Sequence, residues 1–269
     1  MEIPKGLKHL TFGNTMDNRP RPSVFVQGQP GVGKTLLLAE MALKLAKCQP
    51  EDVMIATYPL DDEGLETLRD KKFNWFLVRS NEALKELYES VFLKVKPAAV
   101  IQDNLGAAWW MAFKDRVSDG VMPEDHGKTW NKLASDVMYD VVTRFKTPSF
   151  VKFFGAGSLA MPYEDVLTVN QDKPRGKGAP PPDEKLQTTL PGQLRGTVYG
   201  LFSYCLTLKM ATGEQGRMMR CAETQLTPNA VSKVRAPLSQ QPKKAILYDL
   251  ASADRGIDYL IKELKLEGV

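Results

Sequence analysis

A glycine-rich segment that ends in a lysine and a threonine is the part of the sequence best suited to chemistry. Its glycines allow the backbone to wrap round a phosphate chain with the N–H groups pointing inward. Lys34 supplies a positive charge for the β- and γ-phosphates of a nucleotide, and the Thr35 hydroxyl is suited to binding Mg²⁺. The motif G-x-x-x-x-G-K-[ST], typical of a phosphate-binding loop, is formed by Gly28, Gln29, Pro30, Gly31, Val32, Gly33, Lys34 and Thr35.

The residues on either side of this loop have the pattern that such a loop requires. Residues 23–27 (SVFVQ) are apolar and β-branched, which predicts a buried strand. Residues 34–47 place leucine, methionine and alanine at helical spacing, which predicts an amphipathic helix. Because a strand precedes the glycines and a helix N-terminus follows them, a chance match to the motif is rare. The sequence therefore predicts nucleotide binding.

A magnesium ion bound to phosphate needs a second anionic ligand, usually a carboxylate at the end of a neighbouring strand. Asp103 occupies such a position, because it closes the apolar run of residues 98–103 (AAVIQD). Aspartate also ends strands as an ordinary turn residue. With the phosphate-binding loop upstream, we favour the metal-binding role for Asp103, together with Thr35.

Hydrolysis also requires a group that orients or deprotonates water. Asp61, Asp62 and Glu63 follow a predicted strand, residues 53–57, and so lie at the carboxyl edge of the sheet. Glu63 is the first choice for the catalytic base, with Asp61 or Asp62 as the alternative. An acidic helix N-terminus, favoured by the helix dipole, explains the same acids without catalysis. The guanine-reading order Asn-Lys-x-Asp is absent, since residues 170–173 read Asn-Gln-Asp-Lys, so adenine is the expected base.

The composition is that of an average soluble globular protein. The chain has 269 residues, a formal net charge of +4, 43% hydrophobic residues and a mean hydropathy of -0.29, which excludes wholesale disorder and collagen-like repeats. Three cysteines and two histidines without a CxxC pair argue against a disulfide framework and a zinc site. No apolar stretch reaches the about twenty residues of a membrane span, and the first residues lack the apolar run of a signal peptide. We therefore expect a cytoplasmic protein without membrane contact.

Predicted strands and helices alternate along the first part of the chain. Further strands are expected at residues 73–78 and 149–154, and further helices at residues 81–95 and 128–145. This alternation predicts an α/β fold with a mostly parallel sheet flanked by helices.

The pattern changes after that point. Residues 161–195 are rich in proline, glycine and basic residues and predict a flexible loop without regular structure. Two strand-like runs, residues 198–209 and 217–225, are separated by a turn at residues 211–214 and predict a C-terminal antiparallel strand pair. A closing helix is expected at residues 251–266. The expected organisation is an N-terminal arm (1–22), an ATPase domain (23–250) and a C-terminal helical segment (251–269).

The order of these features resembles the RecA/KaiC-like group of P-loop ATPases, above all its small bacteriophage-encoded branch for recombination and single-strand annealing. The resemblance spans residues 23 to about 236 and rests on GQPGVGKT, DDEGLETL, AAVIQDN, the strand at 149–154, LPGQLRG and Lys233-Val234-Arg235. It implies a RecA-like core that binds ATP and Mg²⁺, with Glu63 as the catalytic carboxylate.

The resemblance also implies a homo-oligomer, either a ring or a filament, with ATP between subunits. In such an assembly Lys233 and Arg235 would reach the γ-phosphate held by the neighbouring subunit, where positive charge stabilises the transferring group. A solvated basic turn explains the same residues equally well. Family members carry Gln or His after the fourth strand, whereas this chain offers only Ser158 there. The difference predicts either an altered coupling between ATP state and DNA binding or slow hydrolysis.

Single-stranded DNA is the partner that the resemblance implies, held on loops at residues 105–128 and 161–195. The first loop offers Trp109 and Trp110 for base stacking, beside nearby cations. A position in the core or in a subunit interface is the alternative for both tryptophans. The second loop offers Lys173, Arg175 and Lys177 for phosphate contacts.

The sequence thus predicts an oligomeric protein that binds and hydrolyses ATP and acts on single-stranded DNA in phage recombination, repair or replication, in the host cytoplasm. Two alternatives stay open. One is a DNA motor, either helicase-like or a packaging ATPase. The other is a nucleotide-gated assembly or scaffold protein with little hydrolysis.

Overall fold

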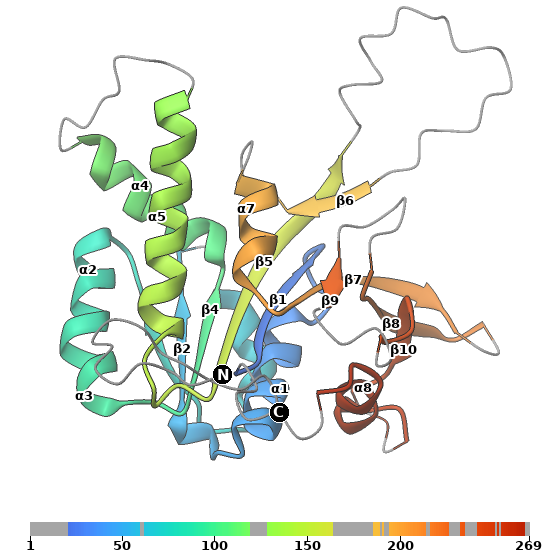
Figure 1. Cartoon of the computed structure of the whole chain (residues 1–269). Coiled ribbons are helices and arrows are strands. Elements are labelled where there is room, and N and C mark those ends of the chain that lie inside the picture. Colours follow the sequence, from blue (N-terminus) through green and yellow to red (C-terminus); the bar gives the residue numbers. More distant parts are fainter. Residues whose placement is uncertain are drawn as a thin grey trace, which may run out of the picture.

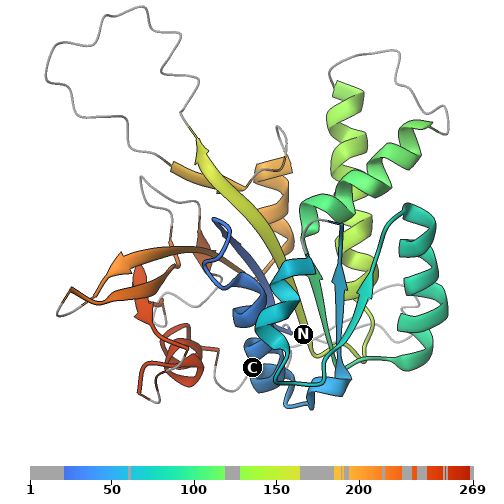
Figure 2. The ribbon, with the colours of Figure 1, turned by 180° about the vertical axis from the view of Figure 1, so that it is seen from behind.

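The structure is a computed structural model that describes residues 21–59, 62–118, 128–163, 185–188, 190, 194–213, 216–225, 232–234, 241–250, 252 and 254–266. Figure 1 shows these residues as coloured ribbon around one central sheet, and Figure 2 shows them from behind. The helices are α1 (Lys34–Ala46), α2 (Asn81–Glu86), α3 (Leu93–Val95), α4 (Leu105–Ser118), α5 (Lys128–Lys146), α7 (Leu194–Leu201) and α8 (Ile257–Glu263), with 3-10 turns η1 (Pro50–Asp52) and η2 (Asp62–Leu68) and a π-helical turn η3 (Leu87–Phe92).

The sheet is parallel in its centre and antiparallel at one side. Its order is β10-β8-β7-β1-β5-β4-β2-β3, with β6 paired to β5 and β9 paired to β7. All strands from β7 to β3 in this order run parallel, whereas β8 and β10 run antiparallel to their neighbours. The strands are β1 (Ser23–Gly28), β2 (Val53–Thr57), β3 (Asn74–Leu77), β4 (Ala99–Asp103), β5 (Phe153–Tyr163), β6 (Lys185–Thr188), β7 (Tyr204–Thr212), β8 (Met218–Glu223), β9 (Lys233–Val234) and β10 (Ala245–Tyr248).

Helices cover both faces of the sheet because the strands alternate their side chains between two apolar cores. In β1, Val24 and Val26 belong to the core beneath α1 and α8, and Phe25 belongs to the core beneath α4, α5 and α7. Figure 1 looks onto the second face and Figure 2 onto the first. The expected α/β class, with a mostly parallel sheet, flanking helices and a C-terminal antiparallel strand pair, is confirmed.

Several predicted elements differ from the structure. The strand expected at residues 149–154 begins only at Phe153 and runs on to Tyr163. The region expected to lack regular structure, residues 161–195, contains the end of β5 and all of β6; residues 164–184 lie outside the described part. The proline-rich composition predicted no regular structure here. The end of β5 and β6 nevertheless form strands, because they pair with each other.

Helical periodicity explains the other differences. The tryptophan-containing stretch expected as a loop forms α4, with Leu105, Ala108, Trp109 and Phe113 buried at helical spacing. The start of the strand expected at residues 198–209 is instead the end of α7, where Leu194 and Val198 are buried one turn apart. The closing helix is shorter than expected and covers only α8. Within the described residues, no helix is both long and apolar enough to cross a membrane.

Candidate functional site

The glycine-rich segment folds as a tight loop between β1 and α1. Gly31 and Gly33 have φ angles of 77° and 89°, in the left-handed region that favours glycine. Lys34 opens α1, and its Nζ donates hydrogen bonds to the carbonyl oxygens of Gly28 (3.0 Å) and Gln29 (2.9 Å). The ammonium group is thereby held over the loop, at the N-terminal end of a helix, where an anion is favoured.

A carboxylate reaches this loop from a strand that is not its neighbour. Asp103 ends β4, and β5 lies between β4 and β1. The Thr35 hydroxyl nevertheless donates a hydrogen bond to the Asp103 carboxylate. A Cβ atom at Gly157 of β5 would lie 2.2 Å from Asp103 Oδ1, so the carboxylate crosses β5 through the space that this glycine leaves.

Asp103 is costly to keep ionised in this place. Its side chain is buried, with 7% of the residue exposed. Burial raises the pKa of the carboxyl, and the Thr35 hydrogen bond and the Lys34 charge oppose that rise. A cation bound beside Asp103 would favour the charged form.

These residues share one cavity of about 330 Å³, which we call the phosphate-loop cavity. It lies at the carboxyl edge of the parallel strands, where ligands bind in open α/β sheets. It is lined by the loop and first turn of α1 (Pro30, Gly31, Gly33, Lys34, Thr35, Leu36), by Gly64 and Thr67, by Asp103 and Asn104, by Ser158 and Leu159, and by Arg220.

The turn that carries the predicted base lies against Thr35 in this cavity. A Cβ atom at Gly64 would lie 2.7 Å from Thr35 Oγ1, so the backbone of η2 approaches the hydroxyl closely. Glu63 directly precedes Gly64 in η2, and its role as base stays a prediction. The alternative Asp61 lies outside the described residues, and Asp62 begins η2.

The serine at the expected sensor position is buried and lines the cavity. Ser158 Oγ donates to the carbonyl oxygen of the adjacent Leu159 at 3.2 Å. The neighbouring strand end places Asn104 there too, with its Oδ1 accepting from the Gly106 N–H at 2.7 Å. The side chain of Asn104 therefore supports the start of α4.

Most of the remaining predicted site residues lie outside the described part of the chain. Lys233 lies in β9, which pairs with β7 at Cys205, and it does not line this cavity. Arg235 falls outside the described residues, as do Lys173, Arg175 and Lys177.

The two tryptophans have opposite environments, and Trp109 occupies the core position that was the alternative to base stacking. Trp109 is 3% exposed, and its Nε1 donates to the carbonyl oxygen of Ala134 in α5 at 3.0 Å. It packs in the core with its ring stacked on Phe113, so it does not offer a free face to a nucleic-acid base. Trp110 is 57% exposed on the outer side of α4.

Sequence reasoning missed a buried chain of polar side chains next to the loop. Gln27, directly before Gly28, donates through Nε2 to the Thr207 hydroxyl at 2.8 Å and accepts from the Tyr199 hydroxyl at 2.8 Å. Ser232 Oγ also donates to the Thr207 hydroxyl at 2.8 Å. The chain ties β1 to α7, β7 and the residue before β9, and a buried glutamine at a strand end was the one local signal for it.

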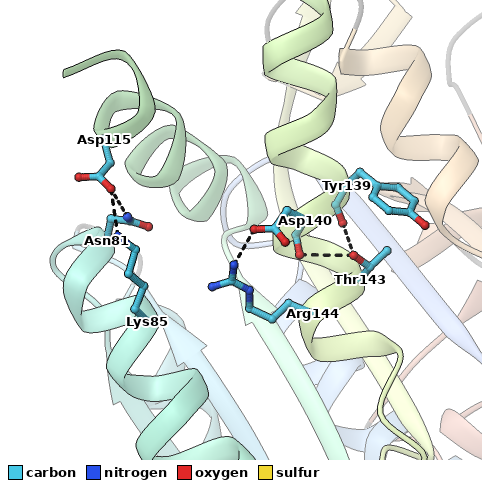
Figure 3. Close-up of polar contacts among 7 residues, drawn as sticks. All are labelled: Asn81, Lys85, Asp115, Tyr139, Asp140, Thr143 and Arg144. Carbon is cyan, nitrogen blue, oxygen red and sulfur yellow. Dashed lines mark hydrogen bonds and ion pairs between the residues drawn. The ribbon is translucent and has the colours of Figure 1, made fainter. Parts of the chain in front are cut away.

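A second cavity of about 470 Å³, which we call the helical cleft, lies between α2, α4 and α5. Four of its charged side chains form two ion pairs (Figure 3). Asp115 accepts from Asn81 and lies 3.4 Å from Lys85 Nζ. Asp140 Oδ2 lies 2.7 Å from Arg144 Nη2, one turn away in α5. These contacts join α2 to α4 or strengthen α5 itself, which is a structural role.

The sequence matches no protein-family model, and no curated protein matches it. Among solved structures, a KaiC-like protein from the hyperthermophilic archaeon Pyrococcus horikoshii is similar over 86% of this chain and 86% of that chain, at 12% identity and a TM-score of 0.46. The flagellar accessory protein FlaH from Methanocaldococcus jannaschii is similar over 86% of both chains, at 11% identity and a TM-score of 0.44. At these values the likeness has no bearing on activity or partners.

Proposed function

We propose that this chain binds ATP with Mg²⁺ in the phosphate-loop cavity and hydrolyses it. The observation that carries this proposal is the contact between the Thr35 hydroxyl and the Asp103 carboxylate beside the glycine-rich loop. A hydroxyl and a carboxylate at the N-terminal end of a helix are hard oxygen ligands next to an anion site. Two protein oxygens leave most of the magnesium coordination shell to phosphate and water, as this metal prefers.

Different side chains would bind the phosphates and the metal ion. The loop N–H groups and Lys34 hold the β- and γ-phosphates, while Thr35 and Asp103 hold the metal ion. When bound, Mg²⁺ would neutralise charge on the phosphate oxygens. The Gly157 opening fits this arrangement, because it allows Asp103 to reach Thr35 across β5. Glu63, beside the close contact of Gly64 with Thr35, would orient and deprotonate the attacking water.

We further propose that the site is completed by a second copy of the chain. Lys233 does not line the cavity of its own chain, which supports a role for Lys233 and Arg235 at a neighbour's γ-phosphate. Mixing Arg235→Ala subunits with Glu63→Gln subunits tests this role. Partial recovery of ATPase activity is expected, and no recovery at any ratio would refute it.

Single-stranded DNA is the proposed macromolecular partner, in phage recombination, repair or replication. The exposed Trp110 and Lys114 lie one turn apart on α4, so an aromatic face and a cation share one side of this helix. Basic residues at Lys173, Arg175 and Lys177 would add phosphate contacts.

The decisive experiment measures ATP hydrolysis and ATP binding by the full chain, with and without single-stranded DNA. Lys34→Ala serves as the blank, and it should bind ATP at least about tenfold more weakly, because charge-assisted contacts to phosphate are lost. Normal ATP binding by Lys34→Ala would refute the site. Hydrolysis that depends on Lys34 but ignores DNA would refute the DNA role alone.

One observation favours a second candidate, a nucleotide-gated scaffold with little hydrolysis. Ser158 stands where the resemblance leads us to expect Gln or His, and its short side chain donates to its neighbour Leu159. Sizing the chain with and without a non-hydrolysable ATP analogue separates the two. Assembly driven by the analogue, without turnover or DNA affinity, would support the scaffold.

A further inference from the structure

An arginine far away in the sequence lies against the phosphate loop. Arg220 belongs to β8, and its Nε donates to the carbonyl oxygen of Val32 at 3.2 Å. A Cβ atom at Gly33 would lie 2.9 Å from this Nε and 3.5 Å from Nη2. Gly33 is therefore required for two reasons, its positive φ and the close approach of the guanidinium.

The pairing of the strands holds Arg220 in this place. Arg220 pairs with Met210 of β7 on one side and with Tyr248 of β10 on the other. Tyr248 is fully buried in the core beneath α1, and cross-strand partners stand on the same face of a sheet. The guanidinium is thus fixed by two strands and by the loop carbonyl rather than projecting freely into solvent.

Arg220 has hydrogen-bonding capacity beyond its contact with the loop carbonyl. A guanidinium carries five N–H donors, and Nε supplies only one of them. Arg220 is half-buried and lines the phosphate-loop cavity. Throughout the described part of the chain, no carboxylate lies within ion-pair distance of it. A half-buried cation that faces a cavity without an acidic partner is stabilised by an anion arriving there.

We propose that Arg220 is a phosphate-binding residue of this site and contacts the α-phosphate side of the nucleotide. The strand order places β8 and β4 on opposite sides of β1. The metal and the β- and γ-phosphates would lie on the Asp103 side of the loop. Arg220 approaches the loop from the opposite side. The phosphate chain continues away from the metal side, which brings the α-phosphate toward Arg220. This inference rests on the proposed nucleotide site.

The contact would also link the antiparallel side of the sheet to the bound nucleotide. β7, β8 and β10 carry Arg220 and its buried support Tyr248, so an anion held by Arg220 tightens this part of the fold onto the loop. Arginine suits the role better than lysine, because its planar fork can donate to the loop carbonyl and to a phosphate together.

The test measures dissociation constants for ADP and for a non-hydrolysable ATP analogue, using the full chain and its Arg220→Gln variant. Both nucleotides should bind roughly tenfold to a hundredfold more weakly to Arg220→Gln, by the same factor, since both contain the α-phosphate. Arg220→Lys should recover part of the affinity, because it keeps the charge and loses the fork. Arg217→Gln is the matched control and should bind normally, since Arg217 is exposed and pairs with Asp249.

Each outcome decides the proposal. Unchanged affinity in folded Arg220→Gln would overturn it, with folding checked by circular dichroism and thermal melting. A loss confined to the ATP analogue would also overturn it, by placing Arg220 at the γ-phosphate. If Arg220→Gln does not fold, Arg220→Lys decides, and normal affinity with normal thermal stability would refute the contact. Failure of the unmodified chain to bind either nucleotide would instead refute the proposed function, and the inference with it.

Discussion

The phosphate-loop cavity and the helical cleft both contain charged side chains, but they compensate these charges in different ways. In the helical cleft, Asp115 contacts Asn81 and Lys85, and Asp140 pairs with Arg144. In the phosphate-loop cavity, Asp103 is paired with a neutral hydroxyl, and Arg220 donates to a backbone carbonyl.

This difference in charge compensation indicates which of the two cavities binds a charged ligand. The ion pairs of the helical cleft are already compensated within the fold. Its other two charged side chains, Arg116 and Asp136, are exposed to water. In the phosphate-loop cavity, the buried carboxylate and the half-buried guanidinium have only neutral hydrogen-bond partners, and the Lys34 charge offsets the burial of Asp103 only in part. A ligand of opposite charge would compensate each of them further. A metal ion beside Asp103 and a phosphate beside Arg220 together provide that compensation.

The largest expected effect is that of Gly157→Ala, which tests whether Asp103 must cross β5. The added Cβ would lie 2.2 Å from Asp103 Oδ1, so the carboxylate must leave its place beside Thr35. Magnesium-dependent ATP binding should fall at least about tenfold, and the free energy of unfolding should fall by about 1–3 kcal/mol. Titration with ATP in the presence and absence of Mg²⁺, together with thermal melting, measures both.

A matched glycine serves as the control. A Cβ atom at Gly200 of α7 meets nothing within 4 Å. Gly200→Ala should therefore leave ATP binding unchanged and keep or slightly raise stability, since alanine favours helix over glycine. Normal binding of Mg²⁺ and ATP by Gly157→Ala would mean that the metal is held without Asp103.

A smaller effect, of opposite sign on stability, is expected for Asp103→Asn. Burial raises the pKa of this carboxyl in the folded chain, so the charged form is disfavoured by folding and lowers stability at neutral pH. Asparagine removes that cost and can still accept from Thr35. The variant should melt at a higher temperature than the unmodified chain in the absence of nucleotide, while magnesium-dependent ATP binding weakens by less than in Gly157→Ala.

The pH dependence of the stability gain provides a control for the Asp103→Asn prediction. An acid with a raised folded pKa lowers stability above that pKa and ceases to do so once it is protonated in both states. The stability gain of Asp103→Asn should therefore shrink as the pH falls through the raised pKa. A gain that does not change with pH would show that the charge of Asp103 is not its cause.

The strand–loop–helix unit could be predicted from sequence because all its signals are local. The apolar run before Gly28, the glycines and the periodicity of α1 lie within about one helix length of each other. The position of Asp103 near the loop could also be predicted from the sequence, because the carboxyl ends of parallel strands share one edge of a sheet. Both inferences use neighbours in sequence or a general rule of topology.

Gly157 and Arg220 could not be predicted, because their importance depends on strand order and register. Gly157 matters only because β5 lies between β1 and β4, and Arg220 only because β8 pairs with β7 beside the loop. No local pattern encodes either pairing. The burial of Trp109 is different, because the apolar spacing in α4 is a local helical pattern, although a loop was predicted there.

The smallest expected effect is that of Asp140→Asn, and it completes the comparison with Asp103→Asn. Asp140 and Arg144 form an i,i+4 pair on α5 in which Asp140 is half exposed, and such pairs stabilise a helix by about 0.2–0.5 kcal/mol. The same chemical change should thus lower stability slightly at Asp140 and raise it at Asp103, with nucleotide affinity altered only at Asp103. Chemical denaturation of both variants with and without ATP and Mg²⁺ measures this contrast. A stability gain at Asp140, or a loss of affinity there, would show that the charges of the helical cleft also await a ligand.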